Sequence, residues 1–290
     1  MSAKRTIKDS VFRHLMKNPK YIPQLHHALT GEPVAVIKSL RLNTLTGVLV
    51  DACRNDLSYI LNGQTVVLSE HQSTINENMP LRMLIYVTKT YERYLSAELL
   101  YLRKRQMLFN PMFYTLYNGT DPTPLRWELK LSDSFLPPHS GKLELVVTVY
   151  NINYVDNNPI LHICPVLREY SFFIHRIRLN QREMSYGQAA KEAVEYCIRH
   201  GILEEFLRKY ESEVVDMVQW KYDQETAIRV NRKEAREEGR EEGREEGLKD
   251  GLLTSVRNLM ESVGWTAKQA MDALKIPPEE RTRFLPLLQA

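Results

Sequence analysis

Residues Arg54 to Arg82 read RNDLSYILNGQTVVLSEHQSTINENMPLR and contain two short apolar runs separated by a turn signal. The runs, 57–61 and 65–68, flank Asn62 and Gly63, residue types that tolerate the positive φ angles of a tight turn. The pattern predicts a β-hairpin, and we expect the rest of the domain to be organised around it.

Two acidic side chains stand near the open end of this hairpin. Asp56 stands at the start of the first strand, and Glu70 lies near the end of the second. Because side chains alternate along a strand, Glu70 and Gln72 emerge on one face of the sheet and His71 on the other. Carboxylates from both strands at one end of a hairpin form the oxygen-rich arrangement that a hard divalent cation needs.

The register of the hairpin tests this interpretation. An ideal two-residue turn pairs Leu61 with Gln64 and therefore places Asn55, rather than Asp56, opposite Glu70. Asp56 would then face the wrong side of the sheet. Convergence of the two carboxylates requires a bulge, a loop longer by one residue, or a bend at Asp56 before the strand begins.

The composition fits a soluble protein with one main domain and a small appendage, since 43% of the 290 residues are hydrophobic and 26% are charged. The formal net charge of +3 is too small to indicate a nucleic-acid-binding protein by itself. Contacts with nucleic acid would have to come from local basic patches.

Cysteine usage and hydropathy bear on the compartment. Cys53, Cys164 and Cys197 are odd in number, scattered and without a CxxC pair, which favours reduced, buried thiols over disulfides or a zinc site. The first residues lack the apolar core of a signal peptide, and no segment approaches about 18 consecutive apolar residues. We expect a cytoplasmic protein without a membrane partner.

A short helix is predicted ahead of the hairpin. Its apolar residues recur at helical spacing, at Val11, Phe12, Leu15 and Met16. Asp9 lies near its start, where a carboxylate complements the helix N-terminus. Asp9 is therefore either a cap or a supporting residue beside a metal ion.

A second helix follows the hairpin. Pro80 is a residue favoured in a first helical turn, and an apolar stripe follows at Leu81, Leu84, Ile85, Thr88, Tyr91 and Leu95. We expect this stripe to pack on the sheet. Arg82, Lys89 and Arg93 are then solvated, or within reach of a phosphate group.

The remaining segments predict an α/β fold. A further helix is expected at 21–29 and strands at 45–50, 112–117, 126–131 and 143–150, and three amphipathic helices are expected between Tyr170 and about Trp220. The richest basic surface comprises His175, Arg176, Arg178 and Arg182. This surface either follows a phosphate backbone or is a solvated helix face.

A charged repeat precedes a helical tail. Glycines occur at 239, 243, 247 and 251, each costing a helix about 1 kcal/mol relative to alanine. Two interpretations remain open: a semi-flexible tether, or a stripe that a second helix approaches closely. The tail, 253–290, is too small to be stable alone, and we expect it to dock across a dimer or on another surface of the chain.

Five separated motifs occur in order along nearly the whole chain. They are NDLSY, LSEHQSTINENMPLRMLIY, FYTLYNG, LELVVTVYNIN and the charged glycine repeat. Together they resemble the Rpn family of recombination-promoting nucleases, also called putative transposases, of the PD-(D/E)XK nuclease superfamily. A single acidic residue followed by ExQ would be a weak signal, whereas five motifs in order are specific.

The resemblance implies a restriction-endonuclease-like mixed sheet flanked by helices in residues 1–225, with C-terminal helices, a helical linker at 226–252 and the tail at 253–290. It implies a DNA endonuclease that uses Mg²⁺ or another divalent cation and is linked to recombination or mobile elements. Asp56 and Glu70 match the family's first and second acidic residues, and Asp9 matches an acidic residue of the family's first helix.

Gln72 matches the position where the superfamily usually has lysine, and in this family glutamine is the usual residue there. A glutamine can orient a water molecule but cannot supply positive charge; Lys89 is one conceivable source. The alternative is a DNA-binding or protein-interaction module whose nuclease activity is weak or lost. In either case we expect a homo-oligomer formed through the tail.

Overall fold

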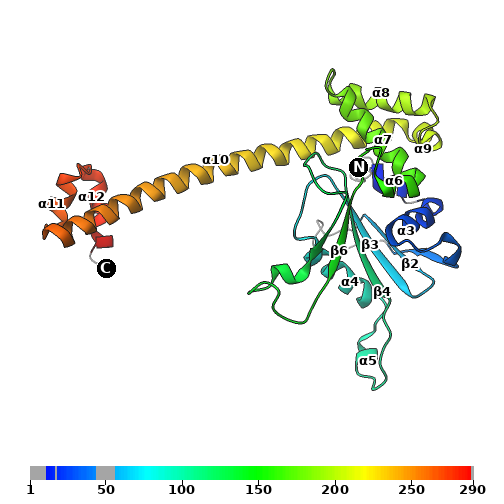
Figure 1. Cartoon of the computed structure of the whole chain (residues 1–290), viewed down its shortest axis with the longest axis horizontal. Helices are drawn as coiled ribbons and strands as arrows, with labels where there is room; N and C mark the ends of the chain where they lie inside the picture. The colour runs from blue at the N-terminus through cyan, green and yellow to red at the C-terminus, as the bar shows by residue number, and fades with distance from the viewer. Residues whose placement is uncertain (1–10, 17, 44–55, 289–290) are drawn as a thin grey trace, which may run out of the picture. The chain divides into compact units, whose positions relative to one another are not determined.

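Six strands form one mixed sheet within the described residues of the computed structural model, in the order β1-β2-β3-β4-β6-β5. Figure 1 labels four of them, β2, β3, β4 and β6. β3 is parallel to β4 and β4 to β6, whereas the pairs β1–β2, β2–β3 and β5–β6 are antiparallel. The strands are β1 (Leu40–Leu42), β2 (Leu57–Leu61), β3 (Thr65–Gln72), β4 (Asn110–Tyr117), β5 (Arg126–Lys130) and β6 (Val146–Asn151). The predicted α/β class is confirmed.

The structure describes residues 11–16, 18–43 and 56–288. The strand expected at 45–50, Asp9 and Cys53 lie outside these ranges. The chain divides into two compact units, Met1–Tyr222 and Asp223–Ala290.

Helices account for most of the remaining structure. Those of the first unit are α2 (Val11–Met16), η1 (Pro19–Tyr21), α3 (Ile22–Thr30), η2 (Val34–Val36), α4 (Met79–Glu92), α5 (Ala97–Leu100), η3 (Leu131–Ser134), α6 (Pro159–Ile163), α7 (Pro165–Asn180), α8 (Tyr186–Arg199) and α9 (Glu204–Lys209). α10 (Glu211–Val263) crosses the boundary between the units, and α11 (Ala267–Ala273) and α12 (Pro278–Leu288) lie in the second unit. No helix among the described residues combines the length and apolarity needed to cross a membrane.

The two faces of the sheet bury different cores because side chains alternate along each strand. Tyr59 and Val67 contribute to the core that also contains α2, α3 and α7, whereas Val66 and Leu68 contribute to the core against α4. Glu70 and Gln72 continue the even-numbered series of β3 and therefore face α4. His71 faces the opposite side, as predicted.

The buried face of α4 differs from the predicted stripe. Leu81 and Ile85 are 46% and 38% exposed, whereas Met79, Met83 and Tyr86 are fully buried. The predicted stripe is therefore wrong at Leu81 and Ile85, although Leu84 and Tyr91 pack against this core as expected.

Both described cysteines are free and buried, as expected for reduced thiols. Burial raises the pKa of Cys164 to about 11 and that of Cys197 to about 12. These thiols are therefore poor nucleophiles at neutral pH, because the thiolate is the reactive form.

The charged glycine repeat is helical throughout, within α10. A Cβ atom added at Gly239, Gly243, Gly247 or Gly251 would meet nothing within 4 Å. In the second unit a small core joins the end of α10 to α11 and α12, and it contains Leu253, Val256, Ala270, Met271, Ile276 and Phe284. The tail therefore buries an apolar core of its own.

Replacing the four repeat glycines by alanine should stabilise α10. Each substitution is expected to add about 1 kcal/mol of helix stability, because alanine removes glycine's conformational entropy cost and there is open space for its methyl group. Hydrogen exchange of amides in the repeat should slow accordingly. Unchanged or faster exchange would contradict the prediction, and circular dichroism provides an independent measure of helicity.

Candidate functional site

The hairpin loop is one residue longer than an ideal two-residue turn. Leu61 pairs with Thr65, so that Asn62, Gly63 and Gln64 form the connection. Asn62 and Gly63 have φ angles of 52° and 65°, in the left-handed region that these residue types tolerate. The register calculated for an ideal turn is therefore wrong, and the longer loop required for convergence is present.

This loop brings Asp56 to the end of the hairpin that carries Glu70. Leu57 pairs with Ser69, so one position further along the two strands Asp56 stands opposite Glu70. Asp56 lies in a bend directly before β2, and its Oδ2 accepts a hydrogen bond of 2.8 Å from the backbone N–H of His71. Both proposed conditions, a longer loop and a bend, are met.

Glu70 is buried among hydrogen-bond donors, with only 4% of its side chain exposed. Its Oε1 accepts from Arg82 Nη2 at 2.9 Å and from the Tyr86 hydroxyl in a short hydrogen bond. Its Oε2 accepts from Gln72 Nε2 at 3.2 Å. Three side chains from β3 and α4 thus fix the orientation of this carboxylate.

Burial raises the pKa of Glu70 to about 7, while the charge of Arg82 lowers it and the charge of Asp56 raises it. Burial and the charge of Glu70 also raise the pKa of Tyr86, so its hydroxyl stays protonated and donates. A divalent cation between Asp56 and Glu70 would favour the ionised carboxylate, because opposite charge stabilises the charged form.

Gln72 is held at the end of β3. Its Nε2 also contacts Met79 Sδ at 2.9 Å, and its backbone oxygen accepts from the N–H of Asn118 at 2.7 Å. Its side chain is therefore fixed beside Glu70, where an amide can hydrogen-bond a water molecule.

Thr115 adds an unsatisfied hydroxyl to the same place. In the parallel pairing of β3 and β4 it stands directly beside Glu70, and it is 3% exposed. Its Oγ1 has no hydrogen-bond partner within the described part of the chain. A buried hydroxyl without a partner costs about 1–3 kcal/mol, which a bound water or ligand would offset.

These residues fit a magnesium ion. Asp56 and Glu70 offer carboxylate oxygens, and Mg²⁺ commonly binds one or two carboxylates while keeping several waters. The ranges 11–16, 18–43 and 56–288 contain no group of three or more His, Cys, Asp or Glu side chains placed to hold a metal. A site here therefore depends on two carboxylates and water, and Asp9 lies outside the described residues.

The sequence pattern placed Arg82 either in solvent or within reach of a phosphate group, but it did not predict that Arg82 and Tyr86 contact Glu70. Both belong to α4, four residues apart, and side chains at that spacing share one helix face. Lys89, considered as a source of positive charge, lies 3.9 Å from Glu92 in an ion pair. The cation that contacts Glu70 is instead Arg82.

The predicted basic surface on α7 is partly engaged in packing. Arg178 donates to Asn153 Oδ1 at 2.7 Å and to the backbone oxygen of Asn118 at 2.5 Å. The guanidinium of Arg176 lies 4.3 Å from the ring centroid of Tyr196. Arg176 and Arg178 therefore make contacts within the protein and are not simply a solvated helix face.

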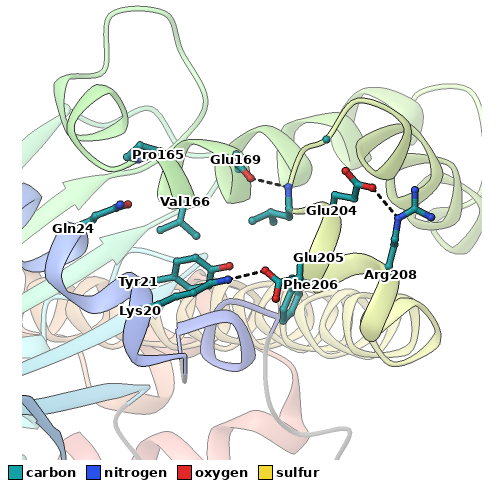
Figure 2. Close-up of a pocket in the computed structure, with 12 residues that line it drawn as sticks. Lys20, Tyr21, Gln24, Pro165, Val166, Glu169, Glu204, Glu205, Phe206 and Arg208 are labelled. Atoms are coloured by element: carbon teal, nitrogen blue, oxygen red, sulfur yellow. Dashed lines mark hydrogen bonds and ion pairs between the residues drawn. The ribbon is translucent and has the colours of Figure 1, made fainter.

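A pocket of about 590 Å³ lies elsewhere in the first unit, among η1, α3, α7 and α9 (Figure 2). Two ion pairs lie in its lining: Lys20 lies 2.7 Å from Glu205, and Arg208 lies 2.9 Å from Glu204. None of the predicted site residues lines it. This pocket is not the acidic site.

Neither the sequence, against protein-family models and curated proteins, nor the fold, against solved structures, finds a match. The family resemblance thus depends on the five quoted motifs. The proposed metal chemistry depends on Asp56, Glu70 and Gln72.

Proposed function

We propose that this protein is an Mg²⁺-dependent DNA endonuclease with a restriction-endonuclease-like core, acting in the cytoplasm in recombination or mobile-element biology. The observation that carries the proposal is the convergence of Asp56 and Glu70 at one end of the hairpin, beside the buried hydroxyl of Thr115. The family resemblance supports DNA as the substrate.

In this proposal Asp56 and Glu70 hold the metal. When bound, Mg²⁺ lowers the pKa of a water molecule and neutralises charge that develops on the phosphodiester. Gln72 orients the attacking water by a hydrogen bond, and Thr115 supplies a further hydrogen-bonding group beside Glu70. Tyr86 keeps the Glu70 carboxylate in a single orientation.

A plasmid assay tests this function. Purified protein with Mg²⁺ should convert supercoiled plasmid to nicked or linear forms, and EDTA should stop the reaction. Absence of cleavage with Mg²⁺, Mn²⁺ and other divalent cations would contradict the proposal.

One observation favours the alternative, a DNA-binding or protein-interaction module without nuclease activity. The Arg82–Glu70 ion pair neutralises the carboxylate within the protein itself. DNA binding that weakens steeply with salt, without cleavage under any divalent cation, would support this alternative.

We also propose self-association through the tail. Large apolar side chains of the second unit are exposed, among them Val263 and Leu285 at 52% and 39%, and such surfaces mark interaction sites when they cluster. Truncation after Glu225 should convert a dimer to a monomer by light scattering. An unchanged oligomeric state after truncation would refute self-association through this region.

A further inference from the structure

Arg82 contacts the buried carboxylate of Glu70 and is itself partly exposed. Its Nη2 lies 2.9 Å from Glu70 Oε1 and 3.0 Å from the Tyr86 hydroxyl. The Arg82 side chain is 29% exposed, compared with 4% for Glu70. Arg82 is thus both a partner of the carboxylate and accessible from solvent.

Charge distinguishes Arg82 from the other partners of Glu70. Tyr86 already donates to Oε1 and Gln72 to Oε2, so both carboxylate oxygens have a neutral donor. Hydrogen bonding alone does not require a third partner, and what Arg82 adds is a permanent positive charge.

A phosphodiester substrate would need that charge. The proposed ligands Asp56 and Glu70 are acidic, and Gln72 and Thr115 are uncharged. A bound Mg²⁺ would balance the two carboxylates, so a further cation is needed to give the site a net positive charge toward an anionic backbone. Guanidinium groups suit phosphate oxygens, because they present several N–H donors in a planar arrangement.

We propose that Arg82 has two roles at this site: it orients Glu70, and its positive charge binds the DNA phosphodiester next to the two carboxylates. This inference rests on the proposed nuclease function. It assigns to α4, rather than to the hairpin, the cationic part of the site.

The test compares Arg82→Gln and Arg82→Lys with the matched control Lys89→Gln, which removes a positive charge from the same helix without touching Glu70. Cleavage rates of the full-length proteins are measured with Mg²⁺ over a range of plasmid concentrations, which separates kcat from KM. Circular dichroism checks that each variant is folded. If Arg82→Gln does not fold, the activity of Arg82→Lys still tests the inference.

Arg82→Gln should lower kcat about 100-fold, the usual effect of losing one preorganised electrostatic group. Arg82→Lys should recover activity to within about 10-fold of the original protein. The control Lys89→Gln should cleave at the same rate as the original protein. Equal losses in both Arg82 variants, or full activity of Arg82→Gln, would overturn the inference while leaving the nuclease function intact. An original protein that cleaves no DNA with any divalent cation refutes both.

Discussion

Glu70→Gln and Asp56→Asn should each lower the rate of Mg²⁺-dependent plasmid cleavage by more than about 100-fold. Losing a group that only supports a metal ligand lowers activity by up to about 100-fold, and losing a direct ligand should cost more. Both substitutions keep the shape of the side chain and remove the negative charge that would hold the metal. Initial rates of plasmid nicking measure the effect.

The fold should tolerate the Glu70 change. Because burial raises the pKa of Glu70 to about 7, its neutral form is already well populated near neutral pH, and a neutral amide resembles that form. Glu128→Gln is the matched control, since it makes the same chemical change at an exposed position of β5. Cleavage by Glu70→Gln at the original rate would exclude Glu70 as a metal ligand.

Gly119→Ala should be the most destabilising small substitution near the site. A Cβ atom at this position would overlap the backbone oxygen of Ser73 and the ring and hydroxyl of Tyr117. Backbone cannot move aside as a flexible side chain does, so we expect a loss of about 3 kcal/mol, at the upper end of typical overpacking costs.

Urea denaturation measures this loss of stability. Gly243→Ala is the control, because a methyl group there meets open space and favours the helix. Ser73 directly follows Gln72, so displacement of its backbone should also reduce cleavage in any Gly119→Ala protein that folds. A stability within about 0.5 kcal/mol of the original would show that the backbone relaxes around the new methyl group.

Local patterns predict much of this fold because they reflect backbone rules. Alternation along β3 correctly separated His71 from Glu70 and Gln72, and the helical spacing of Phe12 and Leu15 identified α2. The class of the domain follows from these elements, whereas the restriction-endonuclease-like topology stays a prediction.

The parts that sequence did not predict depend on tertiary contacts. The loop includes Gln64 as well as Asn62 and Gly63, so the dipeptide signal located the turn without fixing its length. Arg82 and Tyr86 of α4 both contact Glu70 of β3. The local sequence pattern of β3 or of α4 does not specify this contact between them.

The crossover between the parallel strands β3 and β4 has a consequence for folding. Asp56, Glu70, Gln72, Arg82 and Tyr86 all lie in β2, β3, α4 or the bend before β2, a short continuous part of the chain. Contacts between residues close in sequence have a small loop-closure cost and tend to form early. The charged part of the site can therefore assemble before β4 is added, and Thr115 joins it only when the parallel ladder closes.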